Sequence, residues 1–163
     1  MIAVVDVKKE AGHYRSLKTK WLSAFVISTL GFFLIMSFAI AFSPDDYLIL
    51  EIALMVFSTL FIWAALYFFG VIYKRIRRYD RFFQSALSGL KEKERLIFDS
   101  LLEDETISKD GMEVKIMKTH FVENGKTFER DLYVFDDFGP LESGASIDVE
   151  TFSNVVLAYE VTK

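Results

Sequence analysis

The chain has 163 residues, of which 52% are hydrophobic and 26% are charged, and it contains no cysteine. The hydrophobic share is typical of a membrane protein, whereas the charged share is typical of a soluble one. The apolar and the charged residues must therefore lie in different segments of the chain. The lack of cysteine excludes disulfides, thiolate catalysis and zinc–thiolate sites. With about 50 residues assigned to lipid, the remainder is enough for one small soluble domain.

The charge changes sign near Gly89. Residues 1–89 carry ten Lys and Arg against six Asp and Glu, whereas residues 90–163 carry nine against seventeen. The second half therefore has a net charge near minus eight. Because nucleic-acid binding needs a positive surface that displaces counterions from phosphates, we expect no nucleic acid among the partners.

Residues 1–20 form a short basic arm before the first apolar run. The first seven are rich in β-branched side chains and then give way to a polar stretch. They fit either a disordered end or an edge strand added to a later sheet, and we favour disorder.

Two uncharged apolar runs follow, over residues 21–43 and 52–73. At ~1.5 Å of helical rise per residue, each run is long enough to cross the ~30 Å hydrocarbon core of a bilayer. Between them, Pro44 can end the first helix, and Asp45 and Asp46 can cap the second. Residues 21–73 are therefore predicted to form a transmembrane helical hairpin.

Basic residues flank both ends of this hairpin and are absent from its turn. By the positive-inside rule, both termini are expected in the cytoplasm, with the chain crossing the cell membrane twice. Residues 74–89 are expected to continue the second helix as a basic juxtamembrane helix that Gly89 ends. Its five basic residues form what we call the basic collar: Lys74, Arg75, Arg77, Arg78 and Arg81.

The collar has two interpretations. Its charges either report the topology alone or contact anionic lipid headgroups, each contributing on the order of 1 kcal/mol near the surface. Glu51 is the one ionisable group near the membrane interior, and we interpret it as a structural residue that reaches interfacial water rather than as a proton or cation site. Small residues four apart in the first run, such as Ala24 and Ser28, fit close packing within the hairpin or against another chain.

Residues 90–163 are predicted to form an acidic cytoplasmic β-domain. Asn124-Gly125 suits a type I′ hairpin, because both central residues of that turn need positive φ. Strands over 114–123 and 126–135 would then place Phe121 opposite Phe128, Lys118 opposite Asp131, and His120 opposite Glu129. Opposite charges face each other in this register, and we interpret His120 and Glu129 as a cross-strand ion pair.

Other turn-forming dipeptides divide the rest of this domain into strands: Asp110-Gly111, Gly139-Pro140 and Ser143-Gly144. Residues 92–102 fit either a strand or a helix, and we favour a strand. Residues 147–151 and 155–161 are predicted to be the last two strands. About five strands in some 70 residues indicate a small all-β domain, either an OB-like or SH3-like barrel or a twisted antiparallel sheet.

This plan, a membrane hairpin followed by a small cytoplasmic barrel, is similar to that of bacterial NfeD-like membrane proteins. A likeness of architecture by itself implies no activity. The sequence has no glycine-rich phosphate loop, nucleophile elbow or triad spacing, and His13 and His120 lack the partners of a helical metal site. We therefore expect that the protein is not an enzyme and that it binds neither a cofactor nor a metal ion.

Two functions remain. The first is a membrane-anchored adaptor or regulatory subunit, whose β-domain binds a protein partner while the hairpin holds it at the lipid bilayer. The alternative is a subunit of a small channel or transporter. Two spans cannot enclose a path, so that alternative requires a homo-oligomer.

Overall fold

A computed structural model describes residues 2–41, 47–109, 111–135 and 141–162. The chain divides into two compact units. The helical unit is Tyr14–Arg77, and the β unit combines Met1–His13 with Arg78–Lys163. The predicted turns at residues 43–46 and at Gly139-Pro140 lie outside the described residues.

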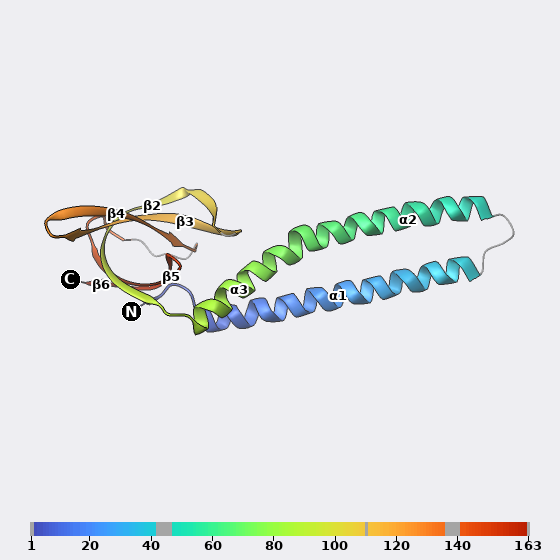
Figure 1. The fold of residues 1–163 in the computed structure, drawn as a ribbon, viewed down its shortest axis with the longest axis horizontal. Helices are drawn as coiled ribbons and strands as arrows, with labels where there is room; N and C mark the ends of the chain where they lie inside the picture. Colours follow the sequence, from blue (N-terminus) through green and yellow to red (C-terminus); the bar gives the residue numbers. More distant parts are fainter. Residues whose placement is uncertain (1, 42–46, 110, 136–140, 163) are drawn as a thin grey trace. The chain divides into compact units, whose positions relative to one another are not determined.

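The helical unit is an antiparallel pair of helices (Figure 1). It contains most of α1 (Val7–Ala41), all of α2 (Tyr47–Tyr67), the π-helical segment η1 (Phe68–Tyr73) and the first turn of α3 (Lys74–Ser88). The first helix begins well before Trp21, where the apolar run starts. Asp6 explains this early start, because its carboxylate accepts a hydrogen bond from the Lys9 backbone N–H at 3.0 Å and so caps the helix.

Aromatic rings join the two helices of this unit. Phe25 stacks on Phe68 with ring centroids 4.7 Å apart, and Phe32 stacks on Phe61 at 4.3 Å. Phe68 is only 8% exposed, whereas outward-facing residues such as Ile35 (71%) and Trp63 (68%) are open. Soluble proteins rarely expose contiguous apolar surface on this scale. Both helices are long and apolar enough to span a membrane.

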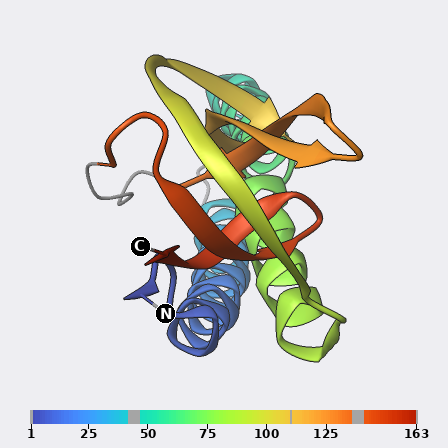
Figure 2. The same cartoon turned by 90° about the vertical axis from the view of Figure 1, so that its left-hand side faces the viewer.

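The β unit contains a six-stranded mixed sheet in the order β1-β6-β4-β3-β2-β5. A further pairing joins β5 to β6, so that the strands from β2 to β6 form a closed circuit of pairings. The long strand β2 makes this circuit possible, because its first part pairs with β5 and its later part with β3 (Figure 2). The strands are β1 (Ile2–Ala3), β2 (Glu92–Lys109), β3 (Met112–Glu123), β4 (Lys126–Val134), β5 (Ser146–Phe152) and β6 (Val155–Thr162).

The hairpin predicted around Asn124-Gly125 is confirmed in its register. Phe121 pairs with Phe128, Lys118 with Asp131, and His120 with Glu129. Asn124 has φ of 50° and Gly125 of 73°, as a type I′ turn requires. Residues 92–102 belong to β2, so the preference for a strand over a helix is also confirmed.

Two expectations about the sheet were wrong. Residues 2–3 are not disordered: they pair with β6, with Ile2 opposite Tyr159. The β-branched arm gains backbone hydrogen bonds there, because β6 offers it a free edge. The sheet is also not purely antiparallel, because β4 and β6 meet in parallel through Tyr133 and Val155.

The core of the β unit lies between the inward-facing residues of these strands. Its most deeply buried side chains include Leu96, Met117, Leu132, Ile147, Val149 and Val156. They recur at alternate positions, as in β5, where every second residue is buried. One face of each strand therefore supplies the core.

The end of α3 packs against the sheet through aromatic residues. Phe82 contacts Phe135 and Phe152, with ring centroids 6.2 and 5.7 Å away, and Phe83 contacts Phe135 at 5.7 Å. Gly89 follows directly after the helix, and a Cβ there would lie 2.4 Å from the Phe152 ring. The Ser85 carbonyl oxygen would lie 2.7 Å from the same Cβ, so the two close approaches favour glycine where the chain passes from α3 into β2.

Candidate functional site

The structure divides the predicted basic collar between the two units. Lys74, Arg75 and Arg77 belong to the helical unit, and Arg78 and Arg81 to the β unit. All five side chains are exposed. The collar is therefore one run in sequence, but only its last two members can take part in a site built by the β unit.

Arg78 and Arg81 line an open pocket of about 440 Å³, which we call the basic pocket. Its other lining residues are Phe82, Ser85, Met112, Phe152 and Ser153. The pocket thus combines two guanidinium groups and two hydroxyls with an apolar wall. Such a mixture suits a ligand that is anionic at one end and apolar at the other.

Two contacts with the start of β3 hold this part of α3 in place. The Tyr79 hydroxyl accepts a hydrogen bond from the Glu113 backbone N–H at 3.0 Å. Arg78 lies against Gly111, where a Cβ would come within 1.6 Å of its Nη1. Gly111 also has φ of 77°, so the tight turn and the close approach of the arginine both favour glycine at this position.

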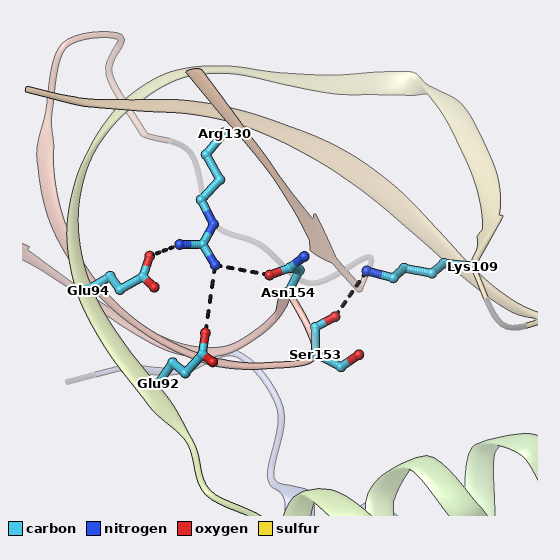
Figure 3. Close-up of polar contacts among 6 residues, drawn as sticks. All are labelled: Glu92, Glu94, Lys109, Arg130, Ser153 and Asn154. Atoms are coloured by element: carbon cyan, nitrogen blue, oxygen red, sulfur yellow. Dashed lines mark hydrogen bonds and ion pairs between the residues drawn. The ribbon is translucent and has the colours of Figure 1, made fainter. Parts of the chain in front are cut away.

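A second cluster centres on Arg130 of β4 (Figure 3). Arg130 forms an ion pair with Glu94 and approaches Glu92 at 3.7 Å, while its Nη2 donates to Asn154 Oδ1 at 3.0 Å. Nearby, Lys109 Nζ donates to the Ser153 carbonyl at 3.0 Å. These contacts bridge β2, β4 and the β5–β6 turn.

The position of the Arg130 cluster indicates a structural role. Arg130 lies two residues from the buried Leu132 on its strand, and Glu94 lies two residues from the buried Leu96. Both side chains are therefore on the inward face of the sheet, with partial exposure. Because β4 and β6 share a single bridge, the cluster reinforces the seam where backbone pairing is sparsest.

On the outer surface, Arg95 and Asp148 form a two-pronged ion pair with distances of 2.7 and 3.1 Å. The hydrogen bond from Arg95 lowers the pKa of the Asp148 carboxyl, and the same bond raises the pKa of Arg95. The pair lines an open groove of about 520 Å³ that also contains Lys93, Glu94 and Glu160. Charges of both signs are present, so the groove has no clear ligand preference.

The partner predicted for His120 was wrong. Glu129 lies opposite it in the register, but His120 Nδ1 instead contacts both carboxylate oxygens of Asp99, at 2.8 and 2.9 Å. Asp99 reaches the histidine because it sits at a bulge of β2, between the paired residues Phe98 and Ser100.

Glu51 lies near the start of α2 with an exposed side chain. Within the described residues, no group of three or more His, Cys, Asp or Glu side chains is placed to hold a metal ion. Glu51 therefore belongs to no such cluster in that part of the chain.

Sequence reasoning missed both the Arg130 cluster and the pocket residues from the β strands. The inward position of Arg130 could have been predicted, because residues two apart on a strand share a face and Leu132 is apolar. The pocket residues from the β strands could not have been predicted, because Met112 and Phe152 come close to Arg78 only when three distant segments of the chain fold together.

The fold thus defines a protein with a hairpin of two long apolar helices and a mixed β-sheet domain. No protein-family model matches the chain, and neither a curated protein nor a solved structure is significantly similar to it.

Proposed function

We propose that the protein is a membrane-anchored adaptor or regulatory subunit whose β-domain binds a protein partner in the cytoplasm. The observation that carries this proposal is the contrast between the two units. The helical unit exposes most of its apolar side chains, whereas the β unit buries most of its own in a core. A bilayer would remove the exposed apolar area from water, at a gain of roughly 25 cal/mol per Å².

The pairing of β1 with β6 supports the proposed topology. Ile2 lies opposite Tyr159, and this pairing supports placing both ends of the chain on the same side of the membrane. The hairpin between them then crosses twice. The basic residues at both ends of the hairpin favour the cytoplasm as that side.

We further infer that the β unit is an OB-like barrel. The closed circuit of five strands and the parallel pairing of β4 with β6 support this assignment. OB domains commonly bind through the strands that correspond here to β3 and β4. At the end of this hairpin Val122 is 60% exposed and Phe128 43% exposed, and the neighbouring charges are of both signs. This surface suits a protein better than a nucleic acid.

Photo-crosslinking in the native membrane tests the adaptor function. A crosslinking amino acid at Thr127, on the exposed end of the β3–β4 hairpin, is expected to capture one discrete protein partner. The same amino acid at Glu142, an exposed residue before β5, is the control and is expected to capture much less.

Two results would count against this function. If mild-detergent extracts yield only this chain and the Thr127 probe captures nothing, the adaptor proposal fails. Crosslinks between copies of this chain alone would favour the oligomeric channel or transport subunit. Solute flux in liposomes containing the purified protein would then be the deciding measurement.

A further inference from the structure

We propose that the basic pocket binds the phosphate group of one anionic phospholipid molecule. This inference rests on the proposed anchoring of the chain in a membrane. It differs from a general attraction of the collar to lipid, because it assigns one molecule to one pocket of the β unit. Three observations carry it: free cationic groups, an apolar wall beside them, and their position after the apolar run.

The first observation is the state of the two arginines. In the part of the chain that the structure describes, neither Arg78 nor Arg81 has an ion-pair or hydrogen-bond partner. Arg95 and Arg130, by contrast, are both engaged with carboxylates. A guanidinium group presents a planar fork of donors that matches the oxygens of a phosphate, so two unengaged guanidiniums in one pocket form a phosphate-binding pair.

The second observation is the wall next to these charges. Phe82 and Phe152 meet edge to face with their ring centroids 5.7 Å apart, and the buried Met112 is also part of the pocket lining. A free phosphate ion would leave this wall in contact with water. A phospholipid can cover it with its glycerol and first acyl carbons, while Ser85 and Ser153 offer hydroxyls to its ester oxygens.

The third observation is the spacing along the sequence. Arg78 and Arg81 follow Tyr73, the last residue of the uncharged run, by five and eight positions. In a helix these positions correspond to a rise of ~7 and ~12 Å. The headgroup layer on each side of a bilayer is roughly 5–8 Å thick, and the long side chain of Arg81 can reach back toward it. The spacing therefore matches the level of lipid phosphates.

Native mass spectrometry of the full-length chain in detergent, after delipidation, tests this site. The probes are dioleoyl-phosphatidylglycerol, dioleoyl-phosphatidylcholine and inorganic phosphate. We expect one phosphatidylglycerol to bind per chain in a saturable manner, with phosphatidylcholine at least fivefold weaker. Millimolar inorganic phosphate is expected to displace little of the lipid, because it cannot cover the apolar wall.

Paired variants separate the pocket from the overall charge. Arg78→Gln with Arg81→Gln is expected to weaken phosphatidylglycerol binding at least tenfold. Lys74→Gln with Arg77→Gln removes the same charge from outside the pocket lining and is expected to weaken it less than threefold. Ser85→Trp keeps every charge but fills the pocket, and it is expected to act like the first pair. Circular dichroism verifies that each variant retains its strand content.

Equal losses from the two charge pairs would overturn the proposal, because they would indicate diffuse attraction. Full displacement by inorganic phosphate would also overturn it, in favour of a free-phosphate site. Its failure is distinguishable from failure of the proposed function. If the chain stays in the membrane and captures a partner but does not bind this lipid, only the lipid site is overturned. If alkaline carbonate extracts the chain from the membrane, the proposed membrane anchor is itself overturned.

Discussion

At the scale of single residues, charge arrangement differs between the inside and the outside of the β unit. Arg130 faces two carboxylates on the inward side of the sheet, whereas Arg95 and Asp148 meet on its exposed surface. The lowered pKa of Asp148 means that its pair stabilises the fold above the ordinary carboxyl pKa and loses this effect as the pH falls through the lowered value. Because the pair is exposed, water screens it and its contribution is small.

Removing Arg130 is expected to have the larger effect. Arg130→Met would leave the partly buried Glu94 beside the core without its cation, and we expect a loss of ~1–3 kcal/mol in the free energy of unfolding. Denaturant unfolding of the detergent-solubilised chain, followed by the strand signal in circular dichroism, measures it.

A double-mutant cycle provides the control for this prediction. Glu94→Gln combined with Arg130→Met should recover part of the lost stability, because it removes the charge that lacks a partner. If the two substitutions are simply additive, Arg130 does not act through Glu94.

At the scale of elements, the features that depend on neighbouring residues could be predicted and those that depend on distant ones could not. Asn124-Gly125 fixes the turn and hence the register of the whole hairpin. The strand at Ile2 could not be assigned, because its partner Tyr159 lies at the other end of the chain. The π-helical segment η1 likewise has no signal in the apolar pattern of the second run.

The junction between α3 and β2 offers a test at this scale. Gly89→Ala would place a Cβ 2.4 Å from the Phe152 ring and 2.7 Å from the Ser85 carbonyl oxygen. The carbonyl oxygen belongs to the backbone, so it cannot rotate away as a side chain could. We expect a loss of ~1–3 kcal/mol in the free energy of unfolding, as for overpacking of a filled site.

Gly12→Ala is the matched control, because nothing lies within 4 Å of its added Cβ and the residue is inside α1. Alanine is the better helix former, so this variant should be more stable by up to ~1 kcal/mol. Both variants can be compared in the same unfolding experiment. A Gly89→Ala protein as stable as the unchanged chain would show that the junction has room to move.

At the scale of the whole molecule, the hairpin is an insertion into the β unit. Residues before it and residues after it build the same sheet, so the β unit cannot be completed until both ends of the hairpin have been made. The sequence predicted the hairpin and the β-domain, but treated the arm of residues 1–20 as a separate piece. Its role could not be predicted, because short β-branched segments pair only where another part of the chain leaves an edge open.

This arrangement makes a strict prediction for the topology. The chain has no cysteine, so a single one can be introduced as a label site. We expect a membrane-impermeant maleimide to label Ser43→Cys in intact cells, because residue 43 belongs to the turn predicted to lie outside. Thr127→Cys, at the exposed end of the β3–β4 hairpin, should react only after the cells are permeabilised. A cysteine at Ile2 should behave like Thr127→Cys, since β1 and β6 are paired. Labelling of Ile2→Cys from outside, together with protection of Thr127→Cys, would contradict both the shared sheet and the two crossings.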